Sequence, residues 1–322
     1  MSITTSGGLT VKELWSVAGF ATCIHISGEK LSENILFDCG ICNRSTVPAK
    51  HIFITHGHVD HIGAIVNHAR ARALSYSPAN YYVPENCVES INSIKEAYQA
   101  LDEHEIKMNI IPFQIGESVK LNNFYEVFSF PTVHRVRSQG YGIKYARKVM
   151  RREFQNLDKR QINKLREEGV NMFDVQETVD IVYSGYTEIS GLLSPGNEFV
   201  FTAEILLIEV TYLDGDISKA HQYGHIHLQE LVSIYERFRN RQIIFVHLSA
   251  RYGPHSRALT VLHQHLPEAM RSYCSVALFS LGSDEHVTSL ERLAESIQTS
   301  RVGWGWGRGG RGRRPYKRAY PG

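Results

Sequence analysis

Short apolar runs recur along the chain, and most of them end at polar residues. The run at residues 35–37 stops at Asp38, and the run at residues 51–54 stops at Thr55 and His56. Runs of this length, rich in β-branched and aromatic residues and bounded by turn-forming segments, are typical of buried strands. The pattern predicts strands that place polar side chains in the loops at their ends.

Strand-like and helical segments alternate along the chain. Further strands are predicted at residues 81–83, 110–115, 125–130, 179–183, 205–210 and 243–246. Helices are predicted at residues 62–74, 86–105 and 228–239 and near residues 256–265. His134, Glu209 and His247 again place polar side chains at strand ends. Such alternation is characteristic of the α/β class.

The length and composition fit one large α/β domain or two modest ones. The chain has 322 residues, of which 43% are hydrophobic, enough for a sizeable core. No stretch of about 18 apolar residues lacks a charged or strongly polar break, and the N-terminus lacks the pattern of a secretory signal. Five cysteines, an odd number, favour reduced thiols. These features argue against a membrane protein and favour the cytosol or the nucleus.

Basic residues concentrate in two segments. Residues 144–168 hold nine Lys or Arg and four acidic residues, which predicts a basic helical insertion; a solvated surface helix is the simpler interpretation. Residues 301–322 hold seven basic residues and no acid, in a Gly/Arg-rich sequence with interleaved Trp and Tyr. This tail cannot bury enough apolar surface to fold, so it is predicted to be disordered, and its Arg and aromatic residues favour RNA contact. The folded domain would then span residues 1–300.

The strongest chemical signal is the segment His56-Gly57-His58-Val59-Asp60-His61, which follows a predicted strand directly. Imidazole nitrogen and carboxylate oxygen are ligands that suit divalent zinc. A single metal ion cannot easily use all four side chains of so short a segment. The natural solution is two ions about 3.5–4 Å apart, with His56 and His58 facing one ion and Asp60 and His61 facing the other.

This segment resembles the metal motif of the metallo-β-lactamase superfamily, and other segments narrow the resemblance. They are similar, in chain order, to motifs of the short form of ribonuclease Z, the transfer RNA 3′-processing endonuclease, especially its plant version: Leu36-Phe-Asp38-Cys-Gly40, Ile52-Phe-Ile-Thr-His56, His134 ahead of Gln139-Gly-Tyr-Gly142, Ile208-Glu209-Val-Thr-Tyr-Leu-Asp214, Gly224-His225-Ile-His227 and Val246-His247-Leu-Ser-Ala-Arg-Tyr252. Several motifs in one order are more specific than the histidine cluster alone. The resemblance covers roughly residues 15–285. It implies the metallo-β-lactamase fold, an αβ/βα four-layer sandwich with two mixed β-sheets.

The resemblance also implies two zinc sites. One site would be formed by His56, His58 and His134. The other would be formed by Asp60, His61 and His247. Asp38 resembles an aspartate that supports the metal ligands from behind.

The chemistry implied by the resemblance is attack of a metal hydroxide on a phosphodiester, with Asp60 orienting the nucleophile. Glu209 would hold His225, and His225 would assist the departing 3′ oxygen. The implied substrate is precursor tRNA, which loses its 3′ trailer. The basic insertion would grip it through Lys148, Arg151 and Arg152, in a homodimer in which the insertion of one subunit serves the active site of the other.

One position departs from the family pattern. The family has an aspartate that bridges both metals in a Tyr-Ser/Thr-Gly-Asp-Thr motif, where this chain has Tyr183-Ser-Gly185-Tyr186-Thr187. A phenol with a pKa near 10 is a poor substitute for an ionised carboxylate, so the second zinc site is expected to be weakened. Three functions stay open: a precursor tRNA endonuclease, a small-molecule hydrolase of the same fold, and an RNA-binding homologue with impaired catalysis.

Overall fold

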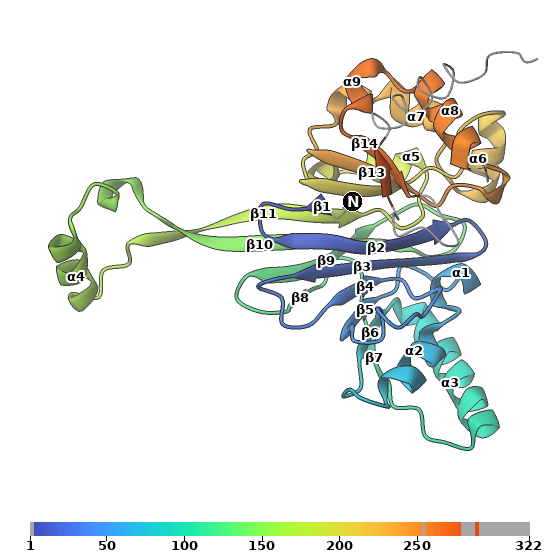
Figure 1. The fold of residues 1–322 in the computed structure, drawn as a ribbon, viewed down its shortest axis with the longest axis horizontal. Coiled ribbons are helices and arrows are strands. Elements are labelled where there is room, and N and C mark those ends of the chain that lie inside the picture. Colours follow the sequence, from blue (N-terminus) through green and yellow to red (C-terminus); the bar gives the residue numbers. More distant parts are fainter. Residues whose placement is uncertain (1–2, 253–254, 278–286, 290–322) are drawn as a thin grey trace, which may run out of the picture.

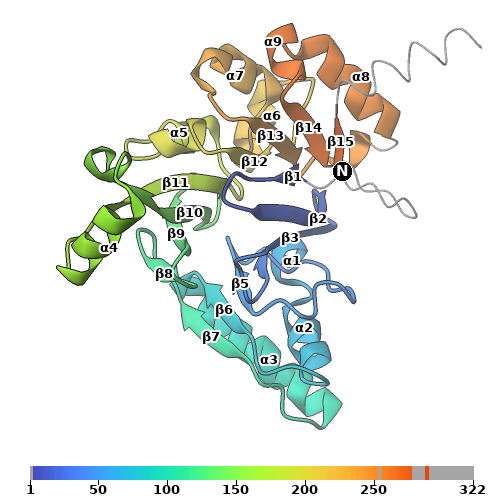
Figure 2. The same cartoon turned by 60° about the vertical axis from the view of Figure 1, so that its left-hand side comes forward.

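The computed structural model describes residues 3–252, 255–277 and 287–289. Within these residues the strands form two mixed β-sheets that lie face to face, and helices cover the outer face of each sheet (Figure 1, Figure 2). The predicted fold class, an αβ/βα sandwich of the α/β type, is confirmed.

The described strands pair into a seven-stranded and an eight-stranded sheet, each in chain order. The first sheet contains β1 (Ile3–Thr4), β2 (Leu9–Val17), β3 (Ala21–Gly28), β4 (Ile35–Phe37), β5 (His51–Phe53), β6 (Asn80–Val83) and β7 (Asn109–Pro112). The second contains β8 (Ser118–Lys120), β9 (Tyr125–Pro131), β10 (Gln139–Met150), β11 (Phe173–Tyr183), β12 (Ile205–Glu209), β13 (Gln242–Val246), β14 (Cys274–Ala277) and β15 (Val287–Ser289). Neighbours from β4 to β7 and from β11 to β14 are parallel, and the others are antiparallel.

The helices divide between the two sheets. Beside the first sheet lie α1 (Val59–Ile62), α2 (Ile65–Arg72) and α3 (Val88–Asp102). Beside the second sheet lie α5 (Ile189–Leu192), α6 (Ile217–Tyr223), α7 (Leu228–Ser233), α8 (His255–His265) and α9 (Glu268–Arg271). The helix predicted at residues 228–239 is shorter in the structure, because α7 passes into a 3₁₀ turn at Tyr235–Arg237.

Three apolar cores fill the spaces between the four layers. One core lies between the first sheet and helices α2 and α3, the second lies between the sheets, and the third lies between the second sheet and its helices. Along β12, Leu206 and Ile208 face the helices, whereas Ile205 and Leu207 face the first sheet. A strand buried on both faces has no polar side to alternate with, which explains the continuous apolar runs in the sequence.

The basic insertion differs from the helical segment that its composition predicts. Residues 144–150 continue β10 and pair with residues 173–179 of β11 in an antiparallel ladder. The helical part is limited to a short 3₁₀ turn and α4 (Lys159–Glu167), which begins at a capping box formed by Asp158 and Gln161. Charged composition carries no information on pairing with a strand more than twenty residues away, so the prediction of a helix over residues 144–150 is wrong.

We call residues 144–179 the arm. The arm projects from the sandwich as a two-stranded ribbon with α4 at its tip (Figure 1). No residue of α4 is buried. Because apolar packing contributes little here, the ribbon ladder and the helix cap hold the arm together.

Of the helices in the described residues, none combines the length and the apolar character needed to cross a bilayer. All five cysteines are free thiols. The predicted disordered tail, residues 301–322, lies outside the described residues, as does the end of the predicted domain of residues 1–300.

The core between the sheets yields a test of the fold. Phe37 is fully buried there, and its ring stacks on Tyr141 and Tyr183 with centroids 5.7 and 5.6 Å away. Replacing Phe37 by Ala should lower the free energy of unfolding by about 3–5 kcal/mol in urea denaturation, because the change leaves a cavity. Phe20→Ala is the control, since Phe20 is 75% exposed and its loss should cost less than about 0.5 kcal/mol. Equal losses in the two variants would contradict the assignment of this core.

Candidate metal centre

Polar side chains collect at one edge of the sandwich, where the carboxyl ends of several strands meet. Asp38 follows β4, His56 follows β5, Tyr186 follows β11, Glu209 ends β12 and His247 follows β13. The sheet registers bring these strand ends side by side, because β4 pairs with β5 and β11 to β13 pair with one another in parallel. The predicted delivery of polar residues by strand ends is therefore what the structure shows.

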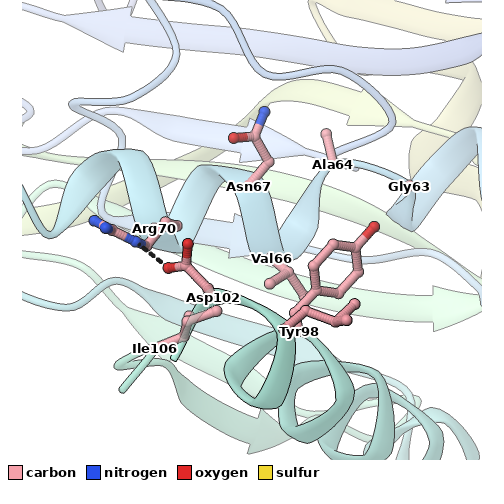
Figure 3. Close-up of a pocket in the computed structure, with 9 residues that line it drawn as sticks. Gly63, Ala64, Val66, Asn67, Arg70, Tyr98, Asp102 and Ile106 are labelled. Atoms are coloured by element: carbon pink, nitrogen blue, oxygen red, sulfur yellow. Dashed lines mark hydrogen bonds and ion pairs between the residues drawn. The ribbon is translucent and has the colours of Figure 1, made fainter. Parts of the chain in front are cut away.

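Two of the surface hollows differ sharply in chemistry. The larger, about 560 Å³, lies between α2 and α3 and carries an Arg70–Asp102 ion pair with atoms 2.6 Å apart (Figure 3). The metal-ligating groups found among the described residues do not include its lining. The other hollow, about 460 Å³, is lined by His58, Asp60, His134, Tyr186, His225 and His247 among others. The second hollow is the candidate site.

His56, His58 and His134 place ring nitrogens within 4.8 Å of one another. Nδ1 of His134 lies 2.7 Å from the carbonyl oxygen of Gly224, which can only accept, so Nδ1 carries the proton and Nε2 keeps its lone pair. Nδ1 of His56 lies 2.9 Å from the hydroxyl of Thr55, which donates its own proton to a carboxylate, so His56 has the same tautomer. Nε2 of both rings is buried without a hydrogen-bond partner. Buried, neutral, inward-facing nitrogens fit a metal ion.

Burial also keeps these imidazoles neutral. It lowers the pKa of His134 to about 4 and the pKa of His56 well below its ordinary value. His58, which is only half-buried, has a lowered pKa for the same reason. Neutral imidazole is the form that binds metal, so these three residues could hold an ion at neutral pH without first losing protons.

Asp60, His61 and His247 form a second group of three with ligand atoms within 4.8 Å. Oδ2 of Asp60 lies 3.7 Å from Nε2 of His61 and 3.4 Å from Nε2 of His247. Tetrahedral zinc with bonds of about 2.0–2.1 Å separates its ligands by about 3.3–3.4 Å. The spacing of this second group is close to that of a zinc site.

Asp38 and Thr211 fix the orientation of the second group from behind. Asp38 accepts a hydrogen bond from Nδ1 of His61 at 2.6 Å, and the hydroxyl of Thr211 lies 2.8 Å from Nδ1 of His247. Asp38 and His247 both adopt a left-handed backbone conformation with φ of 57°. Residues other than Gly rarely adopt it, and it occurs where surrounding contacts hold a side chain in a required direction.

Buried Glu209 and partly buried His225 form an acid–imidazole pair beside both groups, and with His247 they make a third set of ligand atoms within 4.8 Å of one another. Oε1 of Glu209 lies 3.0 Å from Nδ1 of His225, and the carboxylate also accepts hydrogen bonds from the backbone and hydroxyl of Thr211. Burial opposes the charge on both groups, yet each stabilises the charge of the other. The pair thus lowers the pKa of Glu209 and raises the pKa of His225.

Tyr186 stands inside the site rather than at its edge. Its side chain is 2% exposed, and its hydroxyl donates to Oδ2 of Asp60 at 2.9 Å. Burial and the charge of Asp60 raise the pKa of Tyr186 well above 10, so the phenol is a neutral donor. Gly185 turns the chain into the site with φ of 59°, where a Cβ would lie 2.9 Å from Thr55.

Arg135, Tyr212 and Tyr223 line the hollow, and Arg251 contacts Tyr212; the sequence analysis assigned none of these residues a role. The guanidinium of Arg135 lies 5.8 Å from the ring centroid of Tyr223, and that of Arg251 lies 5.2 Å from the ring of Tyr212. Arg135 follows His134 directly, which is the one signal that could have identified it. Thr55 and Thr211, which orient imidazoles, lie within motifs of the family resemblance but were assigned no role from the sequence.

The arm residues Lys148, Arg151 and Arg152 do not join the site within one chain. Gln139, at the start of β10, donates its N–H to the carbonyl of Thr55 at 3.1 Å and so marks the site end of the strand. β10 runs twelve residues to Met150. At a rise of about 3.3 Å per residue the far end lies roughly 35 Å away. Figure 1 shows α1 and α4 on opposite sides of the molecule.

Comparison with known proteins supplies the family. A scan against family models finds no match. The chain is 32% identical to tRNase Z TRZ1 of Arabidopsis thaliana over 240 residues, which cover 74% of this chain and 84% of that protein. It is 31% identical to the chloroplastic tRNase Z TRZ2 of the same plant, covering 74% of this chain and 67% of that protein. A ribonuclease Z of Methanococcus maripaludis is 27% identical over 253 residues, 68% of this chain and 78% of that protein.

Solved structures support the fold. The short form of human tRNase Z superposes with a TM-score of 0.53 at 19% identity, over 78% of this chain and 94% of that one. The metallo-β-lactamase fold protein YhfI of Bacillus subtilis superposes with a TM-score of 0.56 at 15% identity, over 80% of this chain and 94% of that one. With its two sheets, its groups of His and Asp side chains suited to metal and its similarity to the plant enzymes, the chain belongs to the ribonuclease Z (tRNase Z) family of the metallo-β-lactamase superfamily.

Proposed function

We propose that this protein is a zinc-dependent endoribonuclease that removes the 3′ trailer of precursor tRNA. The observation that carries the proposal is the convergence of three overlapping metal-ligating groups, the third of which contains the Glu209–His225 pair, on one hollow, in a chain similar to plant proteins named tRNase Z. The cleaved RNA would keep a 3′ hydroxyl. Large substrates suit an arm that projects from the fold, whereas a small-molecule hydrolase would have no use for it.

His56, His58 and His134 are the proposed first ligands of zinc. The buried Nε2 atoms of His56 and His134 have the right tautomer and no other partner, and His58 lies beside them in the lining of the hollow. Asp60, His61 and His247 form a second group with ligand spacing, in which the hydrogen bond from Tyr186 to Asp60 competes with a metal ion. A bound zinc ion supplies a Lewis acid and lowers the pKa of water toward neutrality.

The proposed catalytic residues act on either side of the scissile phosphate. Asp60 would orient the attacking water through its carboxylate, which lies in the lining of the hollow. Glu209 holds the imidazole of His225 by the 3.0 Å hydrogen bond, so that the ring can donate a proton to the departing 3′ oxygen. The raised pKa of His225 favours the protonated form that this role requires.

Lys148, Arg151 and Arg152 are proposed to bind phosphates of the tRNA body. They lie roughly 35 Å from the start of β10 by the rise of the strand. A folded tRNA could span such a distance, or the arm could serve the site of a partner subunit. We propose the second arrangement, a homodimer. In it, the arm of each subunit binds the RNA whose 3′ end lies in the metal centre of the other subunit.

An RNA-binding homologue without turnover is the second candidate function. The observation that favours it is the position of Tyr186, whose ring lies among the metal-ligating imidazoles. Both candidates predict RNA binding, and they differ in whether the RNA is cut.

Cleavage of precursor tRNA by the purified protein in the presence of zinc tests the proposed activity. The native protein should release the 3′ trailer, and His58→Ala should reduce the rate at least 100-fold, because it removes a proposed ligand. His104→Ala is the control, since His104 is an exposed histidine outside the site. Binding of the RNA without cleavage by the native protein would support the second candidate instead, and full activity of His58→Ala would rule out this site.

The arm assignment predicts a change in RNA binding. Replacing Lys148, Arg151 and Arg152 together by Ala should weaken binding of precursor tRNA at least tenfold and leave the single-turnover cleavage rate within about threefold. The slope of log Kd against log salt should fall by about 2–3, because each lost phosphate contact removes nearly one unit. The matched control replaces Lys12, Lys107 and Lys120, which are exposed on the body. Equal weakening in both triple variants would contradict the arm assignment.

The Glu209–His225 pair makes a separate prediction. Glu209→Gln keeps the shape of the side chain but removes the charge that supports protonated His225, so kcat should fall about 100-fold. Zinc content and RNA affinity should not change. Glu230→Gln is the matched control, because Glu230 forms a 2.6 Å contact with His221 outside the hollow. An unchanged kcat in Glu209→Gln would show that the pair takes no part in catalysis.

A further inference from the structure

We propose that this chain takes up a single metal ion, at His56, His58 and His134, and that Tyr186 closes the group formed by Asp60, His61 and His247. The inference concerns the proposed metal centre and does not require that the protein cleave RNA. It follows from where the ring and the hydroxyl of Tyr186 lie.

The ring of Tyr186 is closer to the second group than to the first. Its centroid lies 3.8 Å from the ring centroid of His247 and 4.2 Å from that of His61. The corresponding distances to the first group are 4.6 Å for His56, 5.4 Å for His134 and 6.4 Å for His58. Aromatic rings in contact have centroids about 4.5–7 Å apart, so the ring contacts imidazoles of both groups and packs most closely on those of the second.

The hydroxyl of Tyr186 is hydrogen-bonded to the Asp60 oxygen that would coordinate a metal ion in the second group. Oδ2 of Asp60 is the atom that faces Nε2 of His61 and Nε2 of His247, and Tyr186 donates to this same atom at 2.9 Å. The backbone N–H of Gly19 donates to it as well, at 3.1 Å. An ion bound between the three ligands would have to displace the phenol proton from this oxygen and push the ring aside.

The ring is closely packed on most of its sides and borders the hollow on another. Its side chain is 2% exposed, and imidazoles of both groups and of His225 surround it. The backbone cannot retreat easily either, because Gly185 lies against Thr55 in a left-handed conformation that fits no larger residue. The position of the phenol is therefore set by the fold.

The first group is less obstructed, because the ring of Tyr186 lies farther from its imidazoles and the hydroxyl of Tyr186 is directed to Asp60 instead. Nε2 of His56 and Nε2 of His134 have no hydrogen-bond partner. Nε2 of His61 has none either, but it faces the oxygen of Asp60 that already accepts from Tyr186. His58 is half-buried and lies in the lining of the hollow, which gives an ion a way in. Three imidazoles with one open position are sufficient for zinc, and sites of this composition support catalysis.

Metal content measured without RNA tests the inference. Metal-free protein is incubated with excess Zn²⁺, freed of unbound metal and analysed by inductively coupled plasma mass spectrometry. The native chain should retain one equivalent, and Tyr186→Asp should retain two, because the change removes the ring and the donor and adds a carboxylate. In the native background, Asp60→Asn should still retain one equivalent, whereas His58→Ala should retain none.

Several outcomes would overturn the inference. They are two equivalents in the native chain, one equivalent in a folded Tyr186→Asp variant, or a native ion that is lost in Asp60→Asn and kept in His58→Ala. The two variants that keep Tyr186 decide the question even if Tyr186→Asp does not fold, which circular dichroism would show. One equivalent in a chain that does not cut precursor tRNA would leave the inference standing and refute the proposed activity.

Discussion

The buried carboxylate of Asp38 is the interaction on which the site depends. It accepts hydrogen bonds from the backbone and hydroxyl of Thr55, from Nδ1 of His61 and from the hydroxyl of Tyr183. These partners belong to the loop after β5, to α1 and to β11, so one side chain ties both sheets to the candidate metal centre. A fully buried carboxylate without such partners would be strongly destabilising. The fold therefore holds His61 in one orientation even without a metal ion.

The sequence predicts the positions of the strands well, but it predicts the register of the strands and the orientation of the site side chains poorly. Apolar runs such as residues 205–210 mark strands that are buried on both faces, and the polar residues at their ends do gather at one edge. Strand composition says nothing of register, so the extension of β10 to Met150 requires knowledge of its partner β11. Likewise, the left-handed backbone of Asp38 and His247 arises from contacts between layers, which no local pattern records.

Tyr186 illustrates the limit most directly. The motif Tyr183-Ser-Gly185-Tyr186-Thr187 indicates a departure at one position, but not whether the new side chain turns into the site or away from it. Gly185 decides this, because its positive φ directs the following residue between the two groups of imidazoles. The sequence predicts that the second zinc site is weakened, and the structure supplies a geometric reason. The phenol of Tyr186 lies against Asp60, His61 and His247, where this group would bind its ion.

The position of the Tyr186 phenol also offsets the negative charge of Asp60, which lies beside the lone pairs of two imidazoles. The carboxylate of Asp60 faces Nε2 of His61 and of His247, and the hydrogen bonds at the far side of each ring leave these two nitrogens with lone pairs. Three electron-rich atoms close together need a positive partner, which a metal ion would supply. The phenol proton of Tyr186 and the N–H of Gly19 supply a smaller share of positive charge to the same oxygen. Because those donors are covalent parts of the chain, the carboxylate of Asp60 is partnered by folding alone, whereas the buried Nε2 atoms of His56, His61 and His134 have no hydrogen-bond partner.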